Sequence, residues 1–123
     1  MDKNIFKLTI PSKPDYISVA RLTSSSIANK VGFNIDDIDD IKVSIAEACI
    51  NALNRAEHID IKFTIQENKF IMSVNNVSMY DNNNEDTNKE MKLGILIIKS
   101  LMDEVNFSKE GVEMIKYIED GSI

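Results

Sequence analysis

Two polar side chains four positions apart, Glu47 and Asn51, form the pairing in the sequence that is best suited to chemistry. If both lie on one helix, this spacing places them over adjacent turns of the same face. A carboxylate can accept a proton from a hydroxyl group or a water molecule, and an amide oxygen is a hard ligand of the kind that Mg²⁺ prefers. The pair could therefore act at one point in space, although Glu and Asn at this spacing also commonly do no more than solvate a helix surface.

The helix that must carry this pair has the clearest signals in the chain. Asn34 or Asp36 can cap its N-terminus, and the acidic run from Asp36 to Asp40 places negative charge near the positive end of the helix dipole. Glu47 and Asn51 fall outside the apolar stripe, so we expect them on the face turned away from the core. The stripe recurs at three- and four-residue steps and consists of Ile38, Ile41, Ile45, Ala48, Cys49, Ala52 and Ala56.

The other elements follow from period-two alternation in strands, helical spacing of apolar residues and turn residues. The expected order is a strand at 5–10, a helix from 15 to about 32, the helix described above, strands at 59–65 and 70–74, a long polar loop over 75–89, a helix at 91–102 and strands at 105–107 and 112–118. This order predicts an α+β fold, a two-layer α/β sandwich with a mixed, mostly antiparallel sheet and helices on one face. Because no repeat or linker divides the chain, residues 1–123 are expected to form a single domain.

Composition narrows the class of partner. The formal net charge of −6 and the pI near 4.7 argue against direct nucleic-acid binding, which needs clustered Lys and Arg. The single cysteine, Cys49, cannot form an internal disulfide, and the N-terminus lacks the apolar stretch of a signal peptide. The longest apolar run is far shorter than the ~20 residues that span a bilayer. We therefore expect a cytoplasmic protein that binds neither nucleic acid nor membrane.

The stretch from Ser44 to Ala56 closely resembles the N-box helix of the GHKL superfamily, in the form found in RsbW and SpoIIAB anti-sigma-factor kinases. Small residues around an E-x-x-x-N core carry this resemblance. Residues 93–105 resemble the glycine-containing loop and following helix of the same kinases, and residues 111–117 resemble their last strand. The resemblance extends from Phe6 to Ile118 and has its most specific motif in the N-box.

The resemblance implies a Bergerat-type sandwich in which ATP lies between the N-box helix and a flexible lid, with Glu47 as general base and Asn51 holding Mg²⁺. It also implies a homodimer that regulates transcription in the stress response or sporulation. Such a protein sequesters a sigma factor and phosphorylates a serine of a STAS-domain anti-anti-sigma protein. The residues implied in nucleotide binding are Asn51, Asn54, Arg55, Asn76, Ser78, Lys92, Leu93 and Gly94.

The sequence departs from the family pattern in both glycine boxes. In the D-x-G-x-G box, Asn76 takes the place of the aspartate, Ser78 that of the first glycine and Tyr80 that of the second. An asparagine can still offer its carbonyl oxygen to the adenine amino group, but it lacks the charge that strengthens such a hydrogen bond. In the G-x-G box, Lys92-Leu93-Gly94 keeps only the second glycine. The implied lid is also shorter than in an active kinase of this type.

Two hypotheses of different classes follow. The first is an anti-sigma factor that is also an ATP-dependent protein-serine kinase, and the intact Glu47 and Asn51 favour it. The second is a non-catalytic partner-switching module with the same fold and lost or weak ATP binding, and the altered glycine boxes favour it. A fragment of a two-component sensor kinase fits less well, because no helix bearing a phospho-accepting histidine precedes the first strand.

Overall fold

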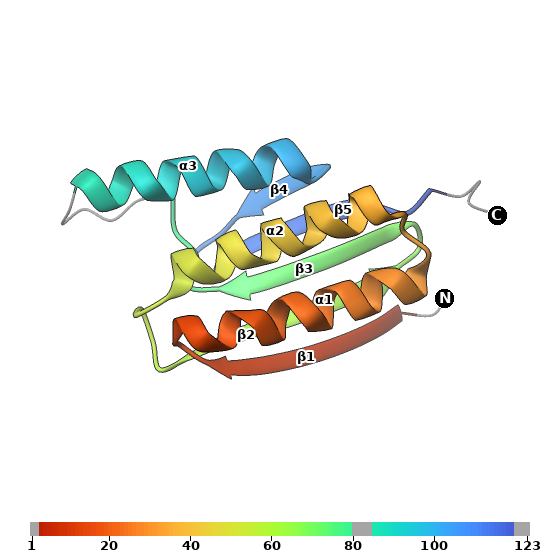
Figure 1. Cartoon of the computed structure of the whole chain (residues 1–123), viewed down its shortest axis with the longest axis horizontal. Helices are drawn as coiled ribbons and strands as arrows, with labels where there is room; N and C mark the ends of the chain where they lie inside the picture. The colour runs from red at the N-terminus through yellow and green to blue at the C-terminus, as the bar shows by residue number, and fades with distance from the viewer. Residues whose placement is uncertain (1–2, 80–84, 120–123) are drawn as a thin grey trace.

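The structure is a computed structural model that describes residues 3–79 and 85–119, with the side chains of 85–87 left out. Along the chain, one strand is followed by two α-helices, two strands, a third α-helix and two further strands (Figure 1). In chain order they are β1 (Lys3–Pro11), the short 3-10 helix η1 (Pro14–Tyr16), α1 (Ile17–Val31), α2 (Ile35–Ala52), β2 (His58–Gln66), β3 (Lys69–Asn75), α3 (Glu85–Leu101), β4 (Glu104–Phe107) and β5 (Gly111–Tyr117).

The strands form one five-stranded sheet in the order β1-β2-β3-β5-β4. Every neighbouring pair is antiparallel, so the sheet is entirely antiparallel, whereas the sequence predicted a mixed, mostly antiparallel sheet. The three α-helices lie together on one face of the sheet (Figure 1). The α+β sandwich predicted from the order of elements is therefore confirmed.

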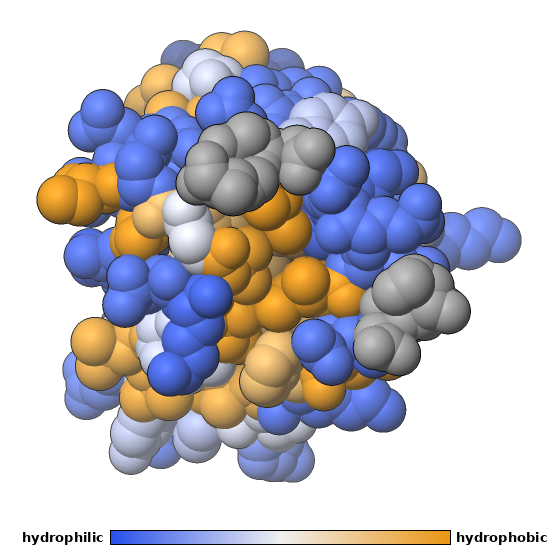
Figure 2. All heavy atoms as spheres, turned by 90° about the vertical axis from the view of Figure 1, so that its right-hand side faces the viewer, coloured by the Kyte–Doolittle hydropathy of each residue, from blue (hydrophilic) through white to orange (hydrophobic). Residues whose placement is uncertain are grey.

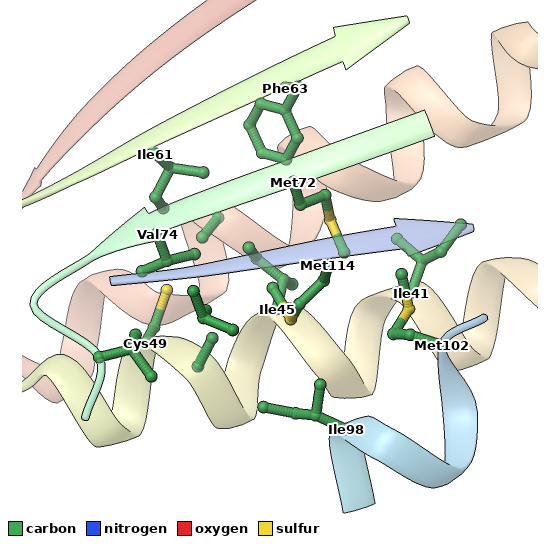
Figure 3. Packing of buried hydrophobic residues seen from close by; sticks show 14 of the residues in the cluster. Ile41, Ile45, Cys49, Ile61, Phe63, Met72, Val74, Ile98, Met102 and Met114 are labelled. Atoms are coloured by element: carbon green, nitrogen blue, oxygen red, sulfur yellow. The ribbon is translucent and has the colours of Figure 1, made fainter. Parts of the chain in front are cut away.

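The core lies between the helices and the inward-facing residues of the central strands. Phe63 of β2 and Phe70 of β3 are fully buried, and their rings stack with centroids 6.2 Å apart and planes 9° apart. Figure 3 shows side chains of β2, β3 and β5 meeting those of α2 and α3 in this layer. The inward-facing residues of the strands thus pack against the apolar stripe of α2. This contact fixes the position of the helix over the sheet.

Different interactions determine where α2 begins and where it ends. Asn34 is the N-cap, and its Oδ1 accepts a hydrogen bond from the backbone N–H of Asp37 at 2.8 Å. The helix ends at Ala52 rather than continuing to Ala56 as the stripe suggested. Leu53 leaves the helical conformation, and Asn54 adopts a left-handed conformation with φ 66°. The N–H of Asn54 then donates to Ser12 Oγ at 2.9 Å, which replaces a helical hydrogen bond.

Helix α3 begins at Glu85, six residues before the position predicted from apolar spacing. Residues 85–90 contain no apolar side chain, so periodicity could not detect this part of the helix. In Figure 1 this end of α3 projects past the sheet, where a helix has no core to face. The predicted loop over 75–89 is therefore too long, and Lys92-Leu93-Gly94 lies inside a helix rather than in a glycine loop.

Lys116 of β5 joins the end of α3 to the start of α2. Its buried ammonium group donates a hydrogen bond to the carbonyl oxygen of Leu101 at 2.8 Å. It also forms ion pairs with Asp37 at 3.7 Å and Asp40 at 3.5 Å. The acidic first turns of α2 thus do more than favour the helix dipole, because they hold the cation that donates to the last carbonyl group of α3.

Candidate functional site

Asn51 lies on the half-buried face of α2 that is turned toward the segment after β3. Its Nδ2 donates a hydrogen bond to the carbonyl oxygen of Ser78 at 2.8 Å, and its Oδ1 accepts one from the Ser78 N–H at 3.0 Å. One side chain amide therefore pairs with both backbone groups of one residue. This pair fixes the plane of the Asn51 amide and holds the beginning of the β3–α3 connection against α2.

Glu47 lies one turn before Asn51, where α2 meets α3. A Cβ atom built on Gly94 would stand 2.8 Å from Glu47 Oε1, which is closer than real Cβ contacts. The carboxylate therefore occupies the space that the missing side chain of Gly94 leaves open. Within the described part of the chain, no hydrogen bond or ion pair engages this carboxylate. Gly94, which matches the glycine of the third box in the family pattern, therefore lies where α3 contacts α2, beside the candidate base Glu47.

Arg55 forms a second link between α2 and α3. Its Nε donates to the carbonyl oxygen of Asn51 at 2.9 Å, and its Nη2 lies 3.6 Å from the Sδ of Met91. The arginine thus follows the end of α2 and reaches the residues that precede Gly94. The resemblance implied that Arg55 lies near the phosphates. Its contact with Met91 could not be predicted from the sequence, because the two residues are 36 positions apart.

The remaining predicted site residues are dispersed. The backbone of Asn54 turns away to Ser12, at the junction of β1 and η1, rather than continuing the helix of Asn51. Lys92 and Leu93 are exposed on α3, the latter at 60%. Asn54, Lys92 and Leu93 therefore lie outside the cluster of predicted residues that the structure brings together. That cluster consists of Glu47, Asn51, Arg55, Ser78 and Gly94.

Asn76 and its neighbour Asn75 differ in what they can offer a ligand. The Asn75 side chain is engaged on the open face of the sheet, where its Oδ1 accepts from the Asp60 N–H at 2.9 Å and its Nδ2 donates to Asp60 Oδ2 at 3.3 Å. Asn76 is half-buried in a left-handed conformation with φ 63°, and its N–H donates to the carbonyl oxygen of Glu110. Of these two asparagines, Asn76 is therefore the one whose side chain makes no hydrogen bond within the described part of the chain. Tyr80 lies outside the described residues.

Cys49 lies on α2 between Glu47 and Asn51 in sequence but faces the core. It is fully buried, and burial raises the pKa of its thiol from 9.0 to about 12. A thiol that stays protonated near neutral pH is a poor nucleophile. Among the described residues there is also no group of three or more His, Cys, Asp or Glu side chains able to hold a metal ion. Glu47 and Asn51 therefore remain the candidates for the chemistry of the site.

The model of the histidine kinase-like ATPase domain matches residues 10–116, which include every element from the end of β1 to β5. The chain belongs to the histidine kinase-like ATPase family. It is 36% identical to the serine-protein kinase RsbW of Bacillus cereus (strain ATCC 10987 / NRS 248), and the matched region covers 92% of this chain and 84% of that protein. The serine-protein kinases RsbW of Bacillus thuringiensis (strain Al Hakam) and Bacillus anthracis are similar to the same extent.

Membership of the histidine kinase-like ATPase family implies ATP as the ligand, and the residues present fit such a ligand in part. Asn51 Oδ1 has two lone pairs, and the Ser78 N–H uses one of them. Asn51 Oδ1 therefore keeps one lone pair for a cation, while the hydrogen bond from the Ser78 backbone fixes the direction in which this oxygen points.

None of the described helices has the length and apolar character needed to cross a membrane.

Proposed function

We propose that this chain is an anti-sigma factor that sequesters a sigma factor and uses ATP with Mg²⁺ to phosphorylate a serine of a STAS-domain anti-anti-sigma protein. The observation that carries the proposal is the placement of Glu47 and Asn51 one turn apart on α2. The Asn51 side chain is hydrogen-bonded to Ser78 in the β3–α3 connection, and the Glu47 carboxylate lies beside Gly94 of α3. The similarity to three serine-protein kinases RsbW supports the choice of a serine hydroxyl as acceptor.

In this proposal each residue has a defined task. Glu47 would accept the proton of the serine hydroxyl, and its carboxylate, which has no partner among the described residues, suits that role. Asn51 would supply an oxygen ligand to Mg²⁺, and Asn76 an acceptor for the adenine amino group. Bound ATP and Mg²⁺ would supply the phosphoryl group and neutralise its charge, so the protein mainly positions the reactants. We further propose that the active protein is a cytoplasmic homodimer.

A second candidate is a binding module of the same family that uses nucleotide poorly or not at all. The pairing of the Asn51 amide with Ser78 favours it, because both polar ends of the amide already have partners. The helical conformation around Gly94 favours it too, since backbone N–H groups inside a helix are not free to bind phosphate.

Calorimetry separates the two candidates. Titration of Mg²⁺ and ATP into the wild-type protein should release heat, and Asn51→Ala should abolish it. Glu47→Gln should keep nucleotide binding while reducing phosphoryl transfer to a STAS-domain partner by at least about 100-fold, the usual contribution of a general base. Absence of heat from the wild type at millimolar ATP would reject the kinase and leave the binding module.

A further inference from the structure

Two of the hollows that described residues line differ in their chemistry. One lies at the end of the molecule that Figure 2 shows, where apolar side chains gather in a depression with hydrophilic side chains around it. The other, of about 440 Å³, lies on the face of the sheet opposite the helices, and the side chains that it receives from β1, β2, β3 and β5 are polar or charged. This volume is within the usual range of small-molecule sites. The proposed phosphoryl transfer uses no side chain of this open face.

A row of cross-strand partners crosses the middle of the second hollow. Lys7 of β1 pairs with Lys62 of β2, which pairs in turn with Ser73 of β3. Ser73 then pairs with Glu113 of β5. Residues paired in this way project from the same face of a sheet, and all four line the hollow. The short Ser73 side chain therefore separates two cations on one side from an acid on the other.

The charges of this row have no ionic partners in the described part of the chain. Within residues 3–79 and 88–119 the ion pairs are those of Lys116, so Lys7, Lys62 and Glu113 take part in none. Like charges that lie directly opposite each other on neighbouring strands repel. An anionic group placed beside the two lysines would relieve this repulsion, and a cationic group would find the same need at Glu113.

The acid that lies nearest to the two lysines in the sheet is already engaged. Asp60 Oδ1 accepts a hydrogen bond from Thr9 Oγ1 at 2.7 Å, and Asp60 Oδ2 accepts one from Asn75 Nδ2 at 3.3 Å. Neutral donors therefore hold both carboxylate oxygens of Asp60, and neither lysine is bound to them. The lysines thus remain the charged groups that this side of the hollow offers to a ligand.

The turn before β5 fixes the acidic side of the hollow. The carbonyl oxygen of Glu110 accepts a hydrogen bond from the Asn76 N–H at 2.8 Å, which ties the turn to the end of β3. At Gly111 a Cβ atom would collide with the carbonyl oxygen of Val74, so only glycine fits this close approach of two strands. Glu110 and Glu113 therefore stand on a fixed hairpin, and the absence of a side chain at Gly111 leaves space between them.

We propose that this hollow binds a short peptide with free termini, whose carboxylate lies at Lys7 and Lys62 and whose ammonium group lies at Glu110 and Glu113. Neighbouring strands are ~4.8 Å apart, so the backbones at Lys62 and Glu113 are separated by about 10 Å across β3. An extended chain spans at most about 3.5 Å per residue, so the two ends of a tripeptide match this separation. A simple anion fits less well, because the acidic side would repel it.

Triglycine tests the hollow without nucleotide, so failure of this inference is distinct from failure of the kinase. Titrated into ¹⁵N-labelled wild-type protein, triglycine should shift the amide signals of Ser73 and Gly111 in a saturable way. N-acetyl-triglycine lacks the ammonium group and triglycine amide lacks the carboxylate. Each should bind at least about threefold more weakly, which is the scale of an exposed ion pair.

Charge-neutral variants locate the two ends of the ligand. The affinity for triglycine should fall at least about threefold for Lys62→Gln and for Glu113→Gln. The matched changes Lys69→Gln at the start of β3 and Glu57→Gln before β2 remove the same charges outside the hollow and should leave the affinity unchanged. All four positions are exposed, so the variants are expected to fold, and circular dichroism checks this.

Three results would overturn the inference. One is the absence of a saturable shift in the wild type, which would mean that water alone solvates this face. Another is equal affinity for triglycine and its two modified forms, or equal affinity of the wild type, Lys62→Gln and Glu113→Gln. The third is binding of a peptide that is capped at both ends and carries Glu and Lys side chains when triglycine does not bind. That result would assign the hollow to the side chains of a partner protein.

Discussion

Asn51 and Ser78 exchange two hydrogen bonds, side chain to backbone in both directions, across 27 positions of sequence. The pair anchors the start of the β3–α3 connection to α2 and sets the orientation of the candidate magnesium ligand. Asn51 therefore has a structural role that is separable from any role in binding a metal ion. Substitutions at this position must be compared for stability before their effect on nucleotide is interpreted.

Asn51→Ala should lower the free energy of unfolding by about 1–2 kcal/mol, because the Ser78 N–H and C=O lose their partners in a half-buried place. Urea denaturation of wild type and variant measures the difference. Lys92→Ala, an exposed change on α3, is the control and should alter stability by less than about 0.5 kcal/mol. Equal stability of Asn51→Ala and wild type would show that the pair contributes nothing to the fold.

Gly94→Ala should impair the site while leaving the fold intact. The new methyl group would stand 2.8 Å from Glu47 Oε1, so the flexible carboxylate must move. Alanine is favoured over glycine inside a helix by about 1 kcal/mol, which offsets the cost of that movement. We expect nearly unchanged stability together with a loss of phosphoryl transfer of about tenfold or more, because misplacement of a catalytic group is costly.

A double-mutant cycle isolates the contact between Glu47 and Gly94. In a Glu47→Ala background the carboxylate is absent, so Gly94→Ala should stabilise the protein by about 1 kcal/mol through helix propensity alone. Urea denaturation of the four proteins gives the coupling energy. If Gly94→Ala has the same effect on stability with and without Glu47, the two residues are not in contact.

The predictable parts of this structure are those whose signals are local. Asn34, as one of two proposed caps, and the apolar stripe located the start and the buried face of α2, and alternation located the strands. The early part of α3 has no apolar residue, so its helical state gave no periodic signal. The end of α2 depends on a hydrogen bond from Asn54 to Ser12, 42 positions away, which no window of sequence contains.

The candidate site shows the same division. The i, i+4 spacing predicted that Glu47 and Asn51 lie on one helix face, and the resemblance to the N-box implied their roles as general base and magnesium ligand. The partners of these residues, Ser78 and Gly94, come from later segments of the chain, and their contacts depend on how α3 packs against α2. The resemblance implied that Gly94 belongs to a glycine-containing loop, whereas in the structure Gly94 lies inside α3 and leaves space for the carboxylate of Glu47.

Ser44→Ala should stabilise the protein. The Ser44 hydroxyl is fully buried on α2 and has no hydrogen-bond partner within the described structure, and alanine is also the better helix former. We expect a gain of about 1 kcal/mol in the free energy of unfolding, measured by urea denaturation. Ser24→Ala is the matched control, because Ser24 is equally buried but donates to the carbonyl oxygen of Arg21 at 2.9 Å. A gain at Ser24 as large as that at Ser44 would contradict the explanation.

Cys49 should make stability depend on alkaline pH in a predictable direction. Burial raises the pKa of its thiol from 9.0 to about 12, so between these values the unfolded chain releases a proton that the folded chain keeps. Its contribution to stability is complete below the unfolded pKa and is lost as the pH rises, with a limiting slope of about 1.4 kcal/mol per pH unit. Urea denaturation at several pH values from about 8 to about 10.5 measures this slope for the wild type.

Cys49→Ala serves as the control, because it lacks the thiol but keeps every lysine and tyrosine that also titrates in this range. Its packing loss is the same at every pH, so the difference in unfolding free energy between the two proteins isolates the thiol. We expect that difference to shrink as the pH rises. A thiol reagent should correspondingly modify native Cys49 only at the rate of opening or unfolding, since the thiolate forms only when the residue is exposed. Parallel stability curves combined with rapid labelling of the native protein would mean that Cys49 is not buried against the sheet.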